Sequence, residues 1–245
     1  MTLRDRLQTL GSDLMTGPFL AVPAPMVVEI ACASGPDFVC IDMEHGPISA
    51  ETGENMVRAT ALHGIPALVR TPGVDAVAIG QALDWGAAGV LVPRVNTAAD
   101  ARAAVEAARF PPEGSRGAGP GRASGYGRAV LAAVERARHE TIVALQIETV
   151  RAVNNLSAIL AVPGVDLLFI GPGDLALGLA AAGRADELGT AIDTILAACS
   201  AAGRAAGIFA MTRDGLRPYE GRVSLGIIGS DATILVAGFD QISGN

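Results

Sequence analysis

Lysine is absent from this sequence, and all 18 basic residues are arginines. Without a lysine amine, the chain cannot form a Schiff base with a carbonyl substrate or with pyridoxal phosphate. It also lacks the phosphate-binding lysine of a P-loop. Imine-forming aldolases and transaminases are therefore excluded, whether or not an arginine-favouring codon usage caused the absence.

Long apolar runs and an excess of positive charge are also absent, and aromatic residues are scarce. Aromatic residues make up 4% of the chain, and no apolar run approaches the roughly 18 residues of a membrane span. The 25 acidic residues give a net charge of −7, which argues against nucleic-acid binding. The segment Met1–Arg6 carries charges of both signs and does not resemble a signal peptide. We therefore expect neither a membrane nor a nucleic acid as a partner.

The cysteines are few and do not form a pattern. Cys32, Cys40 and Cys199 are an odd set without the spacing of a metal site. Reduced, buried thiols of this kind are typical of cytoplasmic proteins. We therefore expect a cytoplasmic localisation.

The chain alternates short apolar segments with alanine-rich stretches, which predicts parallel strands covered by helices. Its length suits one α/β barrel, a fold that commonly has about 250 residues. We predict a (β/α)8 TIM barrel that forms a single domain over residues 1–245. Leu3, Leu7, Leu10 and Leu14 form a helical stripe, with Thr2 as its N-cap. The eight expected strands are Phe19–Val22, Phe38–Asp42, Pro66–Arg70, Gly89–Pro93, Ile142–Glu148, Val165–Gly171, Ala206–Ala210 and Val223–Ile228.

One segment interrupts this alternation. Residues Pro111–Arg128 are too rich in glycine and proline for a helix. Long connections of this kind are often functional, and this one contains Arg116, Arg122 and Arg128. The segment is either a solvated loop or a contact for an anion.

Polar residues follow the apolar strands where the strands end. In a TIM barrel the carboxyl ends of the strands carry the chemistry. Each residue alone has a structural explanation as a helix cap, an ion-pair partner or a loop histidine. Their coincidence at one end of the barrel favours an active site. The residues are Asp42, Glu44, His45, Arg70, Gln146, Glu148 and Asp174.

These residue types suit a hard divalent cation. Carboxylates without a cluster of cysteine and histidine are typical of Mg²⁺ or Mn²⁺ sites. His63 and His139 fall in helical contexts and are expected on the surface. No G-x-S-x-G motif of a serine hydrolase is present. The glycines of residues 117–121 do not follow a strand, so a Rossmann site is not indicated.

Six stretches together resemble one enzyme family. They are FVCIDMEHGP, PALVRTPG, ALDWGAAGVLVPRVNTAADA, RFPPEGSRGAG, ALQIETVRAVNNL and LFIGPGDLALGLA. In this order, over about residues 17 to 235, the chain resembles the HpcH/HpaI class II aldolases, typified by 4-hydroxy-2-oxoheptanedioate aldolase. The resemblance implies a TIM barrel and a metal-dependent carbon–carbon lyase.

The resemblance also implies how the metal and the donor substrate are bound. Glu148 and Asp174 would be the metal ligands, with Mg²⁺, Mn²⁺ or Co²⁺ as the ion. The donor would be a small 2-oxo acid similar to pyruvate. Its carboxylate and keto oxygen would contact Gln146 and the backbone of Gly171, Pro172, Gly173 and Asp174.

The resemblance assigns the reacting steps to other residues. Arg70 would contact the keto oxygen as it becomes an enolate. His45, oriented by Asp84, would transfer the proton. Asp42 would support this network. Glu44 matches the family motif, with a direct or an outer role left open.

The chemistry agrees with these assignments. Cleavage of a β-hydroxy ketone requires an electron sink at the ketone and a base at the hydroxyl. Because lysine is absent, the sink must be a Lewis acid together with a fixed cation such as Arg70. A histidine oriented by a carboxylate titrates in the right range to be the base.

The chain departs from the family pattern in three places. Met43 stands where many members have glycine, and Phe209 on the acceptor side is bulkier than the aliphatic residue expected there. Both changes are expected to alter the preference for the aldehyde. Relatives often exchange a C-terminal helix between subunits and form hexamers, so we expect a homo-oligomer. Here Ala232–Ile242 allows only a brief helix, which leaves the assembly open.

Three functions remain open from the sequence. The first is an aldolase that joins pyruvate or hydroxypyruvate to an aldehyde and cleaves 4-hydroxy-2-oxo acids. The second uses the same metal and enolate chemistry as an acyl-CoA lyase or an oxaloacetate decarboxylase. The third is a metal-free barrel that binds a phosphorylated metabolite through a phosphate nest at Gly226–Asp231.

Overall fold

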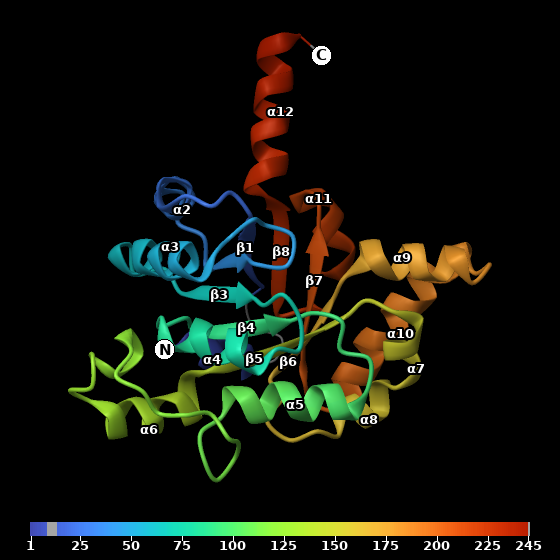
Figure 1. Cartoon of the computed structure of the whole chain (residues 1–245). Coiled ribbons are helices and arrows are strands. Elements are labelled where there is room, and N and C mark those ends of the chain that lie inside the picture. The colour runs from blue at the N-terminus through green and yellow to red at the C-terminus, as the bar shows by residue number, and fades with distance from the viewer. Residues whose placement is uncertain (9–13, 245) are drawn as a thin grey trace.

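Eight parallel strands form a closed barrel in which each strand pairs with its neighbours in the sequence. The computed structural model describes residues 1–8 and 14–244 (Figure 1). The strands are β1 (Met15–Leu20), β2 (Val39–Asp42), β3 (Ala67–Arg70), β4 (Gly89–Val92), β5 (Ile142–Ile147), β6 (Leu167–Ile170), β7 (Ala205–Ala210) and β8 (Leu225–Ser230). The predicted (β/α)8 barrel is confirmed.

The helices lie mainly outside the barrel (Figure 1). They are α1 (Leu3–Gln8), α2 (Pro25–Ala33), α3 (Ala50–Leu62), α4 (Ala76–Asp84), α5 (Ala98–Ala108), α6 (Val130–Glu140), α7 (Val150–Asn154), α8 (Leu156–Leu160), α9 (Pro172–Ala181), α10 (Leu188–Ala201), α11 (Arg213–Leu216) and α12 (Asp231–Ser243). Short 3-10 helices cover Arg122–Ser124, Ala185–Glu187 and Arg217–Tyr219. Polar side chains cap several helices where they leave the strand ends; Ser49 and Asp75, for example, accept hydrogen bonds from the first turns of α3 and α4.

The first strand differs most from its prediction. The expected strand Phe19–Val22 begins at Met15 instead, because the glycine and proline before Phe19 do not form a turn. A Cβ atom at Gly17 would lie 1.9 Å from the carbonyl oxygen of Phe38. Glycine is thus required here by the close approach of β1 to the segment before β2.

Two apolar layers stabilise the barrel. Side chains such as Phe38, Leu91 and Phe169 fill its interior. A second layer, with Ile79 and Ile195 among its members, lies between the strands and the surrounding helices. Strands buried on both faces explain why the sequence segments are continuously apolar rather than alternating.

Helix α1 contributes Leu3 and Leu7 to the interior cluster, beside the first residues of several strands. Thr2 caps it, since its hydroxyl accepts a hydrogen bond from the amide of Asp5 at 3.1 Å. Leu10 of the predicted stripe lies outside the described residues, and the half-buried Leu14 follows them, just before β1. The amino end of the barrel is thus closed by a short helix.

The glycine-rich segment at residues 111–128 packs against the end of α4. Arg116 Nη2 donates to Asp84 Oδ1 at 2.7 Å, and Arg122 Nη1 donates to the carbonyl of Trp85 at 3.0 Å. Arg128 is exposed. Two of the three arginines therefore have partners within the chain, and the segment is more than a solvated loop.

The last helix, α12, extends away from the barrel (Figure 1). It includes the predicted segment Ala232–Ile242, and Phe239 and Ile242 are 63% and 83% exposed. Across the described ranges, no helix is both long enough and apolar enough to cross a membrane.

Candidate active site

The predicted site residues on β2, β3, β5 and β6 lie at the carboxyl ends of these strands. Asp42 and Arg70 are the last residues of β2 and β3 and are partners in the strand register. Gln146 lies in β5, and Glu148 follows this strand directly. Asp174 lies in the first turn of α9, which begins just after β6. Parallel pairing of consecutive strands therefore brings these residues to one end of the barrel.

Arg70 is buried and fixed on several sides. Its Nε and Nη2 donate to the two carboxylate oxygens of Asp42 at 2.8 and 2.6 Å. Its Nη1 lies 3.3 Å from Oε2 of Glu44. Its guanidinium carbon lies 4.1 Å from the ring centre of Phe19, a cation–π contact. Burial lowers the pKa of Arg70, but the hydrogen bonds and charge of Asp42 outweigh this effect and raise it.

Asp42 also shapes the turn that carries the histidine. Its Oδ1 accepts hydrogen bonds from the backbone amides of Glu44 and His45 at 3.1 and 3.3 Å. One carboxylate thus holds both the arginine and the turn. This contact pattern agrees with the supporting role expected for Asp42.

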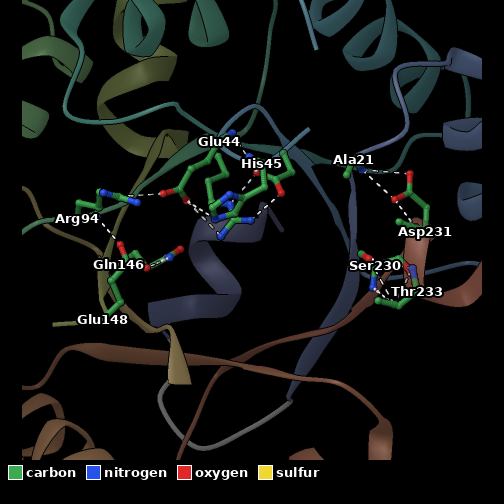
Figure 2. Close-up of polar contacts among 12 residues, drawn as sticks. Ala21, Glu44, His45, Arg94, Gln146, Glu148, Ser230, Asp231 and Thr233 are labelled. Carbon is green, nitrogen blue, oxygen red and sulfur yellow. Dashed lines mark hydrogen bonds and ion pairs between the residues drawn. The ribbon is translucent and has the colours of Figure 1, made fainter. Parts of the chain in front are cut away.

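Glu44 lies between the cations of the site (Figure 2). Its side chain is 6% exposed and lies 3.3 Å from Arg70, 3.4 Å from Nε of Arg94 and 3.7 Å from Nε2 of His45. Burial raises the pKa of Glu44, Arg70 counteracts this, and the charge of Glu148 raises it further. Among the described residues, Oε2 of Glu44 has no hydrogen-bond partner.

The structure does not bring Asp84 to His45 within one chain, so the expected contact between them is not observed. Asp84 ends α4, and the helices of the barrel run opposite to the strands. It therefore lines a cavity with Pro66 and Ala88, which precede β3 and β4 at the amino end. Its carboxylate accepts from Arg116 there. The carboxylate that contacts His45 is Glu44, and the His45 side chain is 57% exposed.

Glu148 and Gln146 form the other part of the site. Glu148 is 3% exposed, and its Oε1 accepts a hydrogen bond from the backbone amide of Arg94 at 2.7 Å. Its Oε2 accepts from Nε2 of Gln146. Oε1 of Gln146 is buried and has no partner in residues 1–8 and 14–244.

The segment before α9 borders this pair. A Cβ atom at Gly171 would lie 3.0 Å from Cβ of Glu148 and 3.3 Å from Nε2 of Gln146. Pro172 begins the helix, and a Cβ atom at Gly173 would have no atom within 4 Å. Glycine at position 171 thus keeps the space over Glu148 and Gln146 free of a side chain.

This donor set fits a hard divalent cation. The described part of the chain contains no group of three acidic, histidine or cysteine side chains that could enclose a metal. Mg²⁺ and Mn²⁺ commonly bind to one or two carboxylates and complete their coordination with water and substrate oxygens. Glu148 and Asp174 would supply the carboxylates, and the amide oxygen of Gln146, which has no partner among the described residues, would be a further oxygen donor.

Phe209 in β7 packs beside Phe19, with ring centres 5.8 Å apart. Because Phe19 also stacks on Arg70, these rings form an aromatic wall next to the fixed cation. Phe19 and Arg94 were not predicted from the sequence. A phenylalanine near a strand end, in a chain with only six, was the available signal for Phe19.

The predicted phosphate nest is filled by the chain itself. Asp231 is buried, and its carboxylate accepts from the amides of Ala21 and Val22 at 2.9 Å (Figure 2). Ser230 caps α12 by accepting from the amide of Thr233. A buried carboxylate within this segment would repel a phosphate, which disfavours the metal-free alternative.

Comparison with known proteins identifies the family. The family model "HpcH/HpaI aldolase/citrate lyase" matches residues 15–236. A 4-hydroxy-2-oxovalerate aldolase of Novosphingobium aromaticivorans is 43% identical over 201 residues, which cover 81% of this chain and 76% of that protein. A hydroxypyruvate/pyruvate aldolase of Delftia acidovorans is 38% identical over 212 residues, covering 85% and 78%.

A solved structure shows the same fold over nearly the whole length. The crystal structure of an HpcH/HpaI aldolase/citrate lyase family protein from Burkholderia cenocepacia aligns with a TM-score of 0.91 and 35% identity. The alignment covers 99% of this chain and 97% of that one. The chain therefore belongs to the HpcH/HpaI aldolase/citrate lyase family, as its motifs predict, and is an enzyme of the aldolase or lyase type.

Proposed function

We propose that the protein is a divalent-metal-dependent aldolase. It would join the enolate of pyruvate or hydroxypyruvate to an aldehyde and cleave 4-hydroxy-2-oxo acids in reverse. The observation that carries the proposal is the arrangement of Glu148 and Gln146. Within the part of the chain that the structure describes, a buried carboxylate without a cationic partner lies beside a buried amide oxygen without a hydrogen bond. The names of the similar aldolases support the same reaction class.

Glu148 and Asp174 are the proposed ligands of Mg²⁺, Mn²⁺ or Co²⁺. When bound, such an ion supplies Lewis acidity at the keto oxygen of the donor substrate. The buried Glu148 keeps its orientation through the amides of Arg94 and Gln146. Asp174 is exposed in the first turn of α9, so it is accessible to an ion in the space beside Gly171.

The donor carboxylate is proposed to bind at the start of α9. The first amide groups of a helix have no partner within the helix and attract anions. Pro172 contributes no amide hydrogen, so the amides of Gly173 and Asp174 are the available donors. Gln146 would orient the donor from the opposite side.

Arg70 is the proposed stabiliser of the enolate oxygen. Its hydrogen bonds to Asp42 and its stacking on Phe19 fix the guanidinium before the reaction begins. A preorganised cation stabilises developing negative charge without reorganisation. Since lysine is absent, this arginine together with the ion replaces the iminium of other aldolases.

His45 is the proposed proton-transfer residue. In cleavage it would accept the proton of the substrate hydroxyl, and in synthesis it would return that proton to the new alkoxide. Its exposed ring can reach a substrate, and Oε2 of Glu44 lies 3.7 Å from its Nε2, close enough to orient the ring. Glu44 thus takes the orienting role that the sequence assigned to Asp84.

Phe209 is proposed to line the acceptor side of the site. Its contact with Phe19 joins it to the wall beside Arg70. An aromatic ring here reduces the space for the aldehyde and presents an apolar surface.

The proposal is tested by deuterium exchange at the methyl group of pyruvate and by aldol addition to glycolaldehyde. After thorough chelation both reactions should stop, and Mn²⁺ or Mg²⁺ should restore both. Full activity without metal would contradict the proposal. Turnover only with acyl-CoA thioesters, or only decarboxylation of oxaloacetate, would favour the alternative lyases.

We also propose that the single domain formed by residues 1–245 self-associates through α12, with a hexamer as the expected assembly. Helix α12 exposes the apolar side chains of Ile234, Val236, Phe239 and Ile242. Exposed apolar patches of this kind often mark a surface that binds another protein chain. Replacement of Phe239 by Asp should shift the mass measured by light scattering toward the monomer. An unchanged mass would contradict the role of α12.

A cytoplasmic location is likewise proposed. The three cysteines are buried and form no disulfide. Burial raises the pKa of Cys199 to about 12 and also raises the pKa of Cys40, where Arg70 acts in the opposite direction. Such thiols are unreactive and suit a reducing compartment.

A further inference from the structure

Arg94 has an unusual backbone at the edge of the site. It follows β4 and has a φ of +57°, in the left-handed region that residues other than glycine seldom adopt. Its amide donates to Glu148 at 2.7 Å, and its carbonyl accepts from Nδ2 of Asn96 at 2.8 Å. The backbone of Arg94 is thus fixed from both sides, and the direction of its side chain is fixed with it.

The side chain of Arg94 is more exposed and makes fewer contacts than that of Arg70. It is 70% exposed, and its Nε lies 3.4 Å from Oε1 of Glu44. Within the described ranges, its two Nη groups have no hydrogen-bond partner. All three nitrogens of Arg70, in contrast, contact Asp42 or Glu44. Figure 2 shows the Arg94 side chain pointing across the site toward Glu44.

The acidic side chains around the site would repel an acceptor substrate that carries a negative charge. Asp42, Glu44, Glu148 and Asp174 are all acidic, and an ion at Glu148 would be occupied by the donor substrate. A carboxylate or phosphate on the aldehyde would therefore be repelled unless a free cation faced it. Arg94 supplies such a cation at the solvent-exposed edge of the site.

We propose that Arg94 is a specificity-determining residue that binds the anionic group of the aldehyde acceptor. The inference rests on the proposed aldolase function and adds the chemical class of the second substrate: an aldehyde that carries a carboxylate or a phosphate. The guanidinium offers two Nη groups to the anion in a bidentate contact. Nε remains on Glu44, which keeps the plane of the guanidinium oriented.

The test must separate the side chain of Arg94 from its backbone, because the amide supports Glu148. Arg94→Asn removes the guanidinium and keeps a residue that tolerates the left-handed conformation. Arg94→Lys keeps the charge. Arg151→Gln is the matched control, since Arg151 is an exposed arginine three residues after Glu148.

The measured quantity is the ratio of kcat/KM for an anionic aldehyde to that for a neutral one of similar size. One pair is glyoxylate and glycolaldehyde, and the other is D-glyceraldehyde 3-phosphate and D-glyceraldehyde, each with pyruvate and Mn²⁺. Any loss transmitted through Glu148 affects both members of a pair and cancels in the ratio. The first pair reports on a carboxylate and the second on a phosphate.

We expect Arg94→Asn to lower the ratio about fivefold to tenfold in at least one pair, as for loss of one charge-assisted contact at a partly exposed site. Arg94→Lys should lower it less than Arg94→Asn does, because lysine keeps the charge but loses the bidentate contact, and Arg151→Gln should change it less than about twofold. An unchanged ratio in Arg94→Asn for both pairs, or an equal fall in Arg151→Gln, would overturn the proposal. Absence of turnover with every aldehyde in the wild-type enzyme would instead contradict the aldolase function.

Discussion

The candidate site has two sides that contain similar acidic residues in different surroundings. The β2–β3 side contains Asp42, Glu44 and Arg70, and the β5–β6 side contains Gln146, Glu148 and Asp174. On the β2–β3 side, Asp42 and Glu44 surround Arg70, so their negative charge is partly balanced within the chain. On the β5–β6 side, Glu148 receives only neutral donors, the amides of Arg94 and Gln146. Among the described residues, neither Glu148 nor Asp174 forms an ion pair.

This difference supports the proposal that a metal ion binds on the β5–β6 side. A buried carboxylate without a counter-charge is costly to desolvate, and proteins usually keep one only when it is paired or binds a metal. The β2–β3 side contains its own fixed cation and is complete. The β5–β6 side has no such cation among the described residues, and the proposed metal ion would supply one there. The proposed reaction would use both the fixed arginine and the Lewis acidity of the ion.

The largest expected effect comes from removing the unbalanced charge. Glu148→Gln should abolish Mn²⁺ binding and lower kcat/KM by about a thousandfold or more, since the electron sink depends on the ion. Glu44→Gln is the matched control: it removes the other buried glutamate, which already has a cation beside it. Calorimetric titration should give a Mn²⁺ affinity for Glu44→Gln within about threefold of the wild type. Equal losses in both variants would erase the proposed distinction between the two sides.

Arg70→Met should produce the next largest effect, from the opposite side. We expect kcat/KM to fall by about a hundredfold to a thousandfold, as for other preorganised groups at a developing oxyanion. The affinity for Mn²⁺ should persist, because Arg70 contacts neither Glu148 nor Asp174. Arg70→Lys should restore little activity, since an ammonium cannot make the paired contact with Asp42 or stack on Phe19 as a guanidinium does. Loss of Mn²⁺ binding in Arg70→Met would contradict the separation of the two sides.

Much of the fold and part of this comparison could be predicted from the sequence. The eight strands were recognisable because a parallel barrel buries both faces of each strand and leaves continuous apolar segments. Asp42, Arg70, Gln146 and Glu148 could be assigned to one end because chain direction fixes which strand ends meet. An ion-pair partner was one of the structural explanations open from the sequence, and strand adjacency places Arg70 beside Asp42.

The remaining features depend on backbone and side-chain conformations that could not be predicted from motifs and strand order. Asp84 was expected beside His45, but a residue at the end of α4 lies toward the opposite end of the barrel. Arg94 was missed because its role depends on a left-handed backbone in a residue type that seldom adopts it. Phe19 was missed because stacking on Arg70 depends on the course of β1, whose register with β8 shifts between Gly17 and Phe19.

A smaller effect on the β2–β3 side is expected from Phe19, because this uncharged side chain holds Arg70 in place by stacking. Phe19→Leu should lower kcat about fivefold to tenfold, as expected for loss of a buried cation–π contact. KM for pyruvate should change less, since the proposed donor contacts lie at Gln146 and α9. Phe19→Trp should retain most of kcat. Phe209→Leu is the control, because Phe209 packs on Phe19, whereas Phe19 itself stacks on Arg70. A larger loss of kcat in Phe209→Leu than in Phe19→Leu would contradict the positioning role.

The smallest expected effect concerns the stability cost of Glu44. Burial, together with the charge of Glu148, raises the pKa of Glu44 against the influence of Arg70. A carboxyl group whose pKa is higher in the folded state binds its proton more tightly there. Its contribution to stability is therefore fully present below the unfolded-state pKa and is lost as the pH rises through the folded-state pKa.

Glu44→Gln stays neutral at every pH and should escape this loss. In chelated buffer, the Tm of Glu44→Gln relative to the wild type should be higher at pH 7.5 than at pH 4, by on the order of 1–3 °C. Glu29→Gln, which removes an exposed carboxylate on α2, corrects for the change in net charge. A relative Tm that falls between pH 4 and pH 7.5 would mean that Arg70 more than balances Glu44. The ionised form of Glu44 would then stabilise the folded protein. The difference between the paired Glu44 and the unpaired Glu148 would be greater than the raised pKa of Glu44 implies.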